Sequence, residues 1–153
     1  MNYTMVSIDC GKEGAMTLWE DVFAREIIDW SFDNGKTLSQ NICDIVYKVE
    51  RIVRYHRPII VMERPGRQMH IQWVMYSDIR YVANRFRCGF HFYMPTAIKK
   101  RVTGNGRASK SEMKRDVWSS GLIVDVNSRE KMLDNEHKVD SMAIGICHIR
   151  KER

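Results

Sequence analysis

The run Ile59-Ile60-Val61-Met62 constrains the fold more than any other part of this sequence. Four consecutive apolar residues without polar alternation predict a strand that is covered on both faces in a parallel sheet. Apolar residues recur at helical spacing on each side of the run, from Leu38 to Val53 and from Ile71 to Phe86. Another strand is predicted at Phe90 to Met94, where Pro95 stops it. This order of strand, helix and strand predicts two parallel strands joined by a helical crossover.

Three short apolar segments precede the first helix. They cover Tyr3 to Ile8, Ala15 to Trp19 and Arg25 to Trp30, with turn residues between them, and they predict an antiparallel meander. The first strand is expected beside the Ile59 strand. The predicted fold is therefore α/β, a five-stranded mixed sheet with three antiparallel strands followed by two parallel ones, flanked by helices. With 153 residues, 44% of them hydrophobic, we expect one domain over residues 1–153.

Capping signals place the helix starts. Thr37 and Gln40 form a capping box at the start of the first helix, and Ser109 and Glu112 repeat it for a helix that continues through Trp118. Residues 121–126 fit either a strand or a loop. The last helix is predicted from about His137 to Ile149.

Acidic residues are expected to meet at one place in this fold. Asp9 ends the first strand, Glu63 ends the Ile59 strand, and His137 and Asp140 share one face at the start of the last helix. Carboxylates forced together repel, so one would be protonated unless a cation held them. Magnesium or manganese ions prefer oxygen ligands. Two such ions, roughly 4 Å apart, would activate a water and steady the leaving oxygen in phosphodiester cleavage.

Each of these residues also has a structural interpretation. Glu63 has two neighbouring cations, Arg64 and Arg67, as possible ion-pair partners. Asp140 fits a solvated acid that the helix dipole favours, and His137 fits a polar surface residue at a helix start. Asp134 is interpreted as a cap rather than a ligand. The remaining histidines lack ligand spacing and are interpreted as structural: His56, His70, His91 and His148.

The distribution of positive charge favours nucleic acid as partner. The net charge is +6, and the segment Lys99 to Arg115 contains a single acid, Glu112. Within it, residues 103–106 form a glycine-containing loop, expected to be mobile. Its candidate DNA-binding residues are Lys99, Lys100, Arg101, Arg107, Lys110 and Lys114. The last two are four residues apart and share a helix face.

Cysteine usage and the amino terminus bear on the compartment. The cysteines Cys10, Cys43, Cys88 and Cys147 are far apart, without metal or redox spacing, and are interpreted as small core residues in a reducing compartment. The chain starts without a positive region followed by a long apolar one, and no apolar run is long enough to span a bilayer. We expect a soluble, intracellular (cytoplasmic) protein.

Four motifs, in order over nearly the whole chain, resemble the RuvC-type Holliday junction resolvases. They are Ser7-Ile8-Asp9-Cys10-Gly11, Val61-Met62-Glu63, the segment from Ile98 to Lys110 that contains Thr103-Gly104-Asn105-Gly106-Arg107-Ala108, and His137 to His148. The third is the most specific. The resemblance implies an RNase H-like fold, a homodimer, dependence on Mg²⁺, and paired symmetric nicks in a four-way junction.

The resemblance also implies residue roles. Asp9, Glu63 and Asp140 match the family's metal-binding carboxylates, and His137 stands where many members have an aspartate. It would bind metal or act as a general acid or base. Lys99, Lys100, Arg107 and Lys110 match the DNA-contacting region. One departure follows Glu63, where bacterial members often have a bulky aromatic but this chain has Arg64-Pro65-Gly66-Arg67. Candidate substitutes are Met69, His70 and Trp73.

The sequence therefore predicts a crossover junction endodeoxyribonuclease, a metal-dependent hydrolase that acts in DNA recombination and repair. Two Mg²⁺ ions per site are expected, with Mn²⁺ able to substitute. The departure after Glu63 would fit a phage or viral member acting on varied branched DNA. Two alternatives stay open: a nuclease of the same fold that cuts flaps and forks, and a catalytically silent DNA-binding module.

Overall fold

A five-stranded sheet forms the centre of the computed structural model, which describes residues 2–123 and 133–152. The strands are β1 (Met5–Asp9), β2 (Glu13–Glu20), β3 (Phe23–Ser31), β4 (Ile59–Glu63) and β5 (Phe90–Tyr93). Their order in the sheet is β3-β2-β1-β4-β5. β1 pairs antiparallel with β2, and β2 with β3, whereas β1 with β4 and β4 with β5 are parallel pairs. The predicted sheet, including the neighbourhood of the first and fourth strands, is confirmed.

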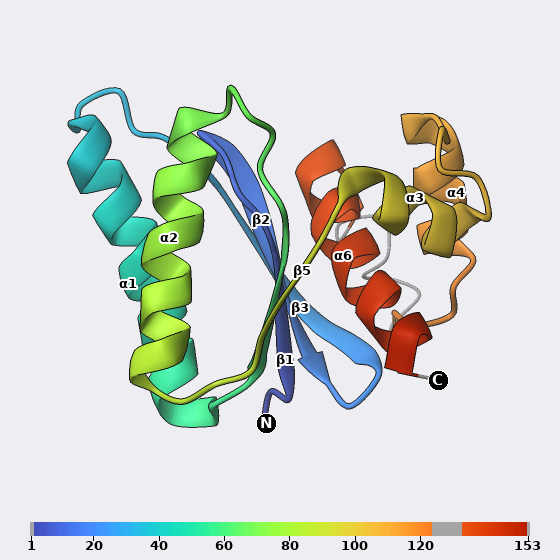
Figure 1. Ribbon diagram of the computed structural model, residues 1–153, viewed down its shortest axis with the longest axis horizontal. Coiled ribbons are helices and arrows are strands. Elements are labelled where there is room, and N and C mark those ends of the chain that lie inside the picture. The colour runs from blue at the N-terminus through green and yellow to red at the C-terminus, as the bar shows by residue number, and fades with distance from the viewer. Residues whose placement is uncertain (1, 124–132, 153) are drawn as a thin grey trace.

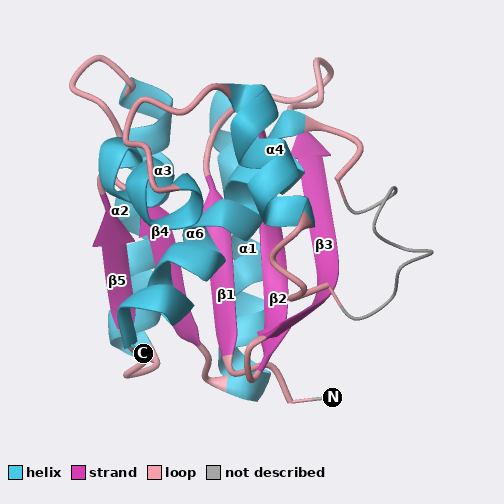
Figure 2. Ribbon diagram, turned by 90° about the vertical axis from the view of Figure 1, so that its right-hand side faces the viewer, coloured by secondary structure: helices cyan, strands magenta, loops and turns pink. Residues whose placement is uncertain are grey.

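Helices cover the two faces of the sheet (Figures 1 and 2). α1 (Leu38–His56) and α2 (His70–Arg85) lie on one face. α3 (Pro95–Thr103), α4 (Lys110–Trp118) and α6 (Glu136–Glu152) lie on the other. α6 packs directly against β1 and β2, and its residues 141–149 are all buried. This helix therefore carries most of the contact between its layer and the sheet.

Alternation along the central strands divides the core into two halves. On β1, Val6 and Ile8 join the cluster under α1 and α2, whereas Met5 belongs to the cluster on the α6 side. β4 divides in the same way, with Ile60 and Met62 on the first side and Val61 on the second. These β4 residues are fully buried, as a parallel strand covered on both faces requires.

The predicted capping boxes start α1 and α4. The Thr37 hydroxyl accepts from the backbone N–H of Gln40, and the Gln40 side chain accepts from the backbone N–H of Thr37. Ser109 and Glu112 repeat this exchange at the start of α4. At the end of α1, Arg57 has the left-handed conformation (φ 47°) and leads the chain into Pro58 and β4.

Sequence reasoning missed helix α3. Pro95, interpreted as the end of a strand, is also the first residue of this helix, where its missing N–H costs nothing. Gly104 ends it with φ 80°. Only Ile98 and Val102 of this helix are buried, so the apolar stripe in the sequence is too short to show a helical period.

Two further expectations need correction or lie outside the described residues. Cys147 is buried, but Cys43 is exposed and Cys10 and Cys88 are only partly buried, so the interpretation of all four cysteines as core residues was wrong. Cys43 stands on α1 outside its buried stripe.

The ambiguous segment 121–126 is described only to Ile123, which forms an isolated parallel bridge with Ala24. Among the described helices, none is long and apolar enough to cross a membrane.

Candidate active site

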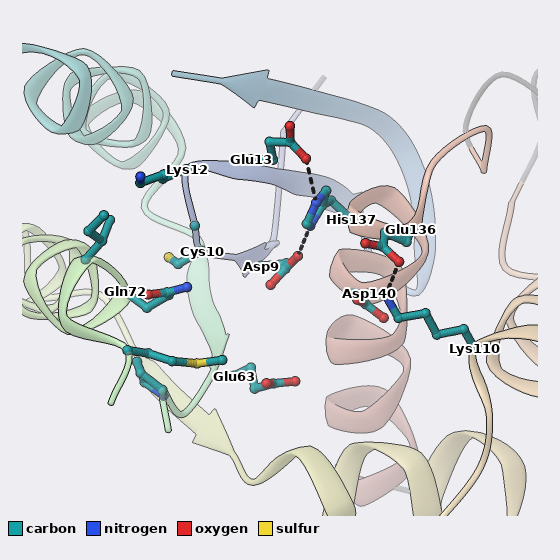
Figure 3. A pocket seen from close by; sticks show the side chains of 14 residues that line it. Asp9, Cys10, Lys12, Glu13, Glu63, Gln72, Lys110, Glu136, His137 and Asp140 are labelled. Carbon is teal, nitrogen blue, oxygen red and sulfur yellow. Dashed lines mark hydrogen bonds and ion pairs between the residues drawn. The ribbon is translucent and has the colours of Figure 1, made fainter. Parts of the chain in front are cut away.

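The carboxyl ends of β1 and β4 and the first turn of α6 enclose one pocket (Figure 3). β1 and β4 are parallel neighbours, so Asp9 and Glu63 reach the same edge of the sheet. His137 and Asp140 face them from α6. The cavity has a volume of about 600 Å³. Its lining residues are Asp9, Cys10, Gly11, Lys12, Glu13, Glu63, Pro65, Met69, Ile71, Gln72, Lys110, Glu136, His137 and Asp140.

His137 lies between two carboxylates. Its Nδ1–H donates to Asp9 Oδ2 over 2.9 Å, and its Nε2 lies 3.5 Å from Glu13 Oε2. The hydrogen bond to Asp9 raises the pKa of His137 above its usual range, because a carboxylate favours the imidazolium. The side chains of Asp9 and His137 are 20% and 27% exposed. His137 is thus a half-buried member of the site, not a free surface residue.

Burial and mutual repulsion shift the carboxyl groups toward the neutral form. Burial, and after it the charges of Asp9 and Asp140, raises the pKa of Glu63 to about 7. Burial and the charge of Asp9 raise the pKa of Asp140 to about 6. Burial also raises the pKa of Asp9, although the hydrogen bond from His137 opposes this. Burial is thus the main cause of all three shifts, and repulsion among the carboxylates adds to it for Glu63 and Asp140.

The structural interpretations of these acids can now be compared with the geometry. Within residues 2–123 and 133–152, no ion pair joins Glu63 to Arg64 or Arg67. The Arg64 guanidinium lies over the Phe92 ring instead. Asp140 is half-buried rather than solvated.

Asn135, not Asp134, caps the start of α6. The Asn135 Oδ1 accepts from the backbone N–H of Lys138, whereas Asp134 pairs with the Lys138 side chain over 3.0 Å. The interpretation of Asp134 as the cap was therefore wrong by one residue.

The pocket also contains residues that sequence reasoning missed. Glu13 opens β2 directly after the turn that follows Asp9, so the hairpin returns a second acid to the same place. Trp30 fixes this hairpin: its Nε1–H donates to the Gly11 carbonyl, and a Cβ on Gly14 would lie 2.5 Å from its ring. Glu136 and Gln72 also line the pocket. The hairpin turn itself is the one sequence signal that points to Glu13.

The basic residues lie at different distances from the acids. Lys110 lines the pocket and pairs with Glu136, and Lys114 joins it around a smaller adjoining cavity. Lys99 is close enough to lower the pKa of Glu63, against the larger effect of burial. Lys100 and Arg107 are exposed.

Arg101 lies apart from this group. Its guanidinium stacks on the Tyr93 ring and donates to Cys147 Sγ over 3.7 Å, toward the C-terminal half of α6. Its role in binding DNA stays a prediction.

Trp73 and Met69 are two of the candidates to substitute for the missing aromatic residue after Glu63. Trp73 donates from Nε1 to the Gly66 carbonyl and packs edge-on against Tyr76, so it holds the β4–α2 connection. Met69 lines the pocket and is 48% exposed. Met69 and Pro65 are therefore the apolar side chains that this connection contributes to the pocket.

The donor set fits a hard divalent cation. In the described part of the chain, no three His, Cys, Asp or Glu side chains lie close enough together to hold a metal ion as they are placed. Carboxylate oxygens from three separate elements nevertheless face one cavity, where burial and, after it, the neighbouring carboxylates raise the pKa values of Glu63 and Asp140. Oxygen-rich, open sites of this kind suit magnesium, which keeps several of its waters.

Sequence comparison relates the chain to RuvC proteins. It is 25% identical to the crossover junction endodeoxyribonuclease RuvC of Mycobacterium avium (strain 104) over 117 residues, 72% of this chain and 59% of that protein. The RuvC of Corynebacterium jeikeium (strain K411) is 27% identical over 99 residues, 61% of this chain and 57% of the relative. The chain thus spans less than two thirds of these relatives. No protein-family model matches it.

Structure comparison gives the same relation. Thermus thermophilus RuvC superposes with a TM-score of 0.78 at 15% identity, covering 97% of this chain and 95% of that one. T. thermophilus RuvC in complex with a Holliday junction substrate gives 0.76 at 18% identity, covering 99% and 96%. The predicted RNase H-like fold and the resemblance to RuvC are confirmed.

Proposed function

We propose that this chain, which is similar in sequence to RuvC and has the RuvC fold, is a metal-dependent endonuclease that resolves four-way DNA junctions by paired symmetric nicks. The observation that carries the proposal is the meeting of Asp9, Glu63 and Asp140 in one pocket beside a basic wall. A cluster of acids next to cations makes sense when a metal ion links it to a phosphodiester. This activity would serve DNA recombination and repair. The proposed compartment is the cytoplasm.

Asp9, Glu63 and Asp140 would hold the metal, with His137 as a further ligand or an acid. Two Mg²⁺ ions are proposed, and Mn²⁺ as a substitute. When bound, the metal would supply an activated water for attack in line on the phosphodiester and stabilise the leaving oxygen. Its charge would also keep the three carboxyl groups ionised at neutral pH, against the burial that raises their pKa values.

His137 has a defined proton to offer. Its Nδ1–H points at Asp9, and this contact favours the charged imidazolium. In its charged form the ring could give this proton to a leaving oxyanion, and in its neutral form it could serve as a metal ligand.

The basic residues position the DNA. Lys110 and Lys114 lie on the exposed side of α4 next to the acids, where phosphates of a bound arm would replace Glu136 as the partner of Lys110. Lys99, Lys100 and Arg107 extend this positive surface along α3 and the loop after it, and Arg101 would contact DNA only at a distance from the acids. These side chains would fix the register of the backbone and carry no sequence information by themselves.

A homodimer would supply the second nick. The exposed side of α2 and its neighbour β5 presents apolar side chains that a second copy could cover, among them Val74 (48% exposed), Tyr81 (68%) and Phe92 (47%). Two copies related by a two-fold axis would place two active sites on a junction of the same symmetry.

A nuclease for flaps and forks is the second candidate function, because Arg64-Pro65-Gly66-Arg67 follows Glu63 where bacterial members often have a bulky aromatic residue, and Met69 from this connection lines the pocket. A binding module without catalysis is disfavoured, since a protein that only binds DNA has no need of a cluster of acids beside its basic residues.

The test is nicking of an end-labelled four-way junction in Mg²⁺, beside a flap, a fork and linear duplex. We expect paired cuts at symmetric positions in the junction and a loss of at least about 10³-fold in Asp9→Asn, which removes one carboxylate while keeping its shape. Equal cutting of every branched substrate would replace the resolvase by a general branched-DNA nuclease. Tight junction binding without cuts in Mg²⁺ or Mn²⁺ would leave the binding module.

A further inference from the structure

A chain of buried hydroxyl groups lies directly behind the acidic pocket. Ser7, Thr17 and Ser141 are each 0% exposed, as is Trp19. Trp19 Nε1–H donates to Ser7 Oγ over 2.8 Å, and Ser7 Oγ donates to the Ser141 carbonyl over 2.7 Å. These bonds join β1 and β2 to α6 at the point where the helix leaves the pocket.

The direction of each remaining bond follows from counting protons. Ser141 Oγ donates its only proton to the Lys138 carbonyl over 3.0 Å. The contact of 2.8 Å between Thr17 Oγ1 and Ser141 Oγ therefore has Thr17 as donor. The hydroxyl protons of Ser7, Thr17 and Ser141 are thus all donated. Two separate series of hydrogen bonds join the sheet to the backbone of α6.

Strand and helix periodicity place this chain in line with the active site. Ser7 and Asp9 are two residues apart on β1 and share a face, and His137 and Ser141 are four apart on α6 and share a face. The contact between Ser7 and Ser141 is therefore the next contact between β1 and α6 after that of 2.9 Å between Asp9 and His137. If α6 moved along its axis by one residue, about 1.5 Å, both contacts would break.

The backbone of α6 has no freedom to shift sideways at this point. A Cβ on Gly145 would lie 2.2 Å from the Trp19 ring, so the ring lies directly on the helix one turn after Ser141. The same indole donates to Ser7. Packing by Trp19 and hydrogen bonding by the hydroxyls therefore act on the same turn of the helix.

We propose that the hydroxyl chain fixes the register of α6 on the sheet and so sets His137 and Asp140 opposite Asp9, which makes Thr17 and Ser141 positioning residues. Neither side chain lines the pocket, so each acts through the residues it holds. The link to catalysis rests on the proposed function, whereas the register itself does not.

Thr17→Val is the central variant, because it keeps the shape of the side chain and replaces the hydroxyl that donates to Ser141 by a methyl group. Thr17→Ser keeps that proton and is the conservative partner. Val49→Ala is the control: Val49 is a residue of α1 with 0% exposure, packed on the other face of the sheet, and the change leaves a cavity without touching α6.

Two readouts separate positioning from general stability. The first is amide hydrogen exchange of peptides covering residues 136–145, which needs neither metal nor DNA. We expect Thr17→Val to exchange there about tenfold faster, the result of one lost buried hydrogen bond, with Thr17→Ser within about twofold of wild type. The second is the Mn²⁺ dissociation constant, expected to rise about tenfold in Thr17→Val, as for other residues that orient ligands.

The controls decide the outcome. Val49→Ala should lower overall stability at least as much as Thr17→Val. It should leave the Mn²⁺ affinity unchanged, and hydrogen exchange at residues 136–145 should not change relative to the rest of the protein. Equal effects of Val49→Ala and Thr17→Val in both readouts would overturn the proposal, as would wild-type values in Thr17→Val. If Thr17→Val does not fold, Ser141→Ala, which keeps the bond from Ser7 to the Ser141 carbonyl, takes its place in both measurements.

The experiment also separates this proposal from the proposed function. If wild-type protein fails to nick junctions, the endonuclease proposal fails while the exchange data still judge the register. If it nicks junctions but Thr17→Val exchanges and binds Mn²⁺ as wild type does, only the positioning role fails.

Discussion

The first turn of α6 and the rest of the same helix are built on opposite principles. Glu136, His137 and Asp140 face a pocket where burial and the charge of Asp9 raise the pKa of Asp140 to about 6. From Ser141 to Ile149 every side chain is buried, and the polar atoms of Ser141 have partners. One helix thus combines a turn that is unfavourable without a ligand and three turns that anchor it.

The difference shows how the fold tolerates an unfavourable site. Repulsion among Asp9, Glu63 and Asp140 favours moving α6 away from the sheet, because distance lowers the Coulomb energy. The close contact between Trp19 and Gly145 and the bonds to Ser141 oppose that movement. Separate residues can therefore be changed to weaken the anchor or relieve the repulsion.

Gly145→Ala should have the largest effect on stability, because it breaks the anchor. Ala favours a helix over Gly by about 1 kcal/mol, but its Cβ would lie 2.2 Å from the Trp19 ring. We expect the clash to win and the free energy of unfolding to fall by about 1–3 kcal/mol, measured by urea denaturation.

The control is the double variant Trp19→Leu, Gly145→Ala. Leucine lacks the three ring atoms that the new Cβ would meet, so adding Gly145→Ala to Trp19→Leu should cost nothing or stabilise. An additive loss in the double variant would show that the ring contact is not the cause.

The sequence predicted the sheet, and the meeting of Asp9 and Glu63 at one edge of it, because both follow from the order of strands and helices along the chain. The apolar run Ile59 to Met62 and the helical stripes around it determine strand order, and strand order brings Asp9 and Glu63 together. Glu13 was missed because an exposed acid at the start of a strand has no distinguishing pattern. Its contact with His137 depends on how α6 sits on the sheet.

The anchor of α6 was likewise hidden in the sequence. Ser7, Thr17 and Ser141 are ordinary polar residues by composition, and their hydrogen bonds span up to 134 positions. The close approach of Gly145 to Trp19 is also a long-range contact. Such contacts follow from packing in three dimensions, which periodicity along one segment does not contain.

Glu63→Gln should relieve the repulsion among the acids of the pocket, at the first turn of α6. The pKa of Glu63 in the folded protein is about 7, above its usual value of 4.5. The folded state therefore binds more protons than the unfolded one between these values, so this group's contribution to stability falls as pH rises from 4.5 to 7. At pH 8 without metal, we expect the free energy of unfolding of the variant to exceed that of the wild type by about 1–3 kcal/mol.

The measurement is thermal unfolding at pH 5 and pH 8, with and without Mg²⁺. The advantage of Glu63→Gln should shrink at pH 5, where wild-type Glu63 is already protonated. Mg²⁺ should raise the melting temperature of the wild type at pH 8 more than that of the variant. A variant that melts below the wild type in metal-free buffer at pH 8 would contradict the repulsion.

His148→Asn should have the smallest effect and the opposite dependence on pH, because it lies in the anchored part of α6. Burial, and after it the neighbouring His91, lowers the pKa of His148 below 6.5. The unfolded state therefore binds more protons as pH falls through 6.5, and the contribution of His148 to stability is lost in that direction. The ring contacts His91 at 4.8 Å between centroids, and Nδ1 is 2.9 Å from Tyr93 Oη.

Asparagine keeps a polar atom near the position of Nδ1 but cannot take up a proton. At pH 8 the variant should lose about 1 kcal/mol or less if that atom retains the bond to Tyr93. Between pH 6.5 and pH 5, the free energy of unfolding should fall less steeply in the variant than in wild type, as measured by urea denaturation at each pH. Equal slopes would mean that His148 stays neutral or charged in both states. The two parts of α6 would then differ in packing alone, and the response to pH would belong to the acidic turn.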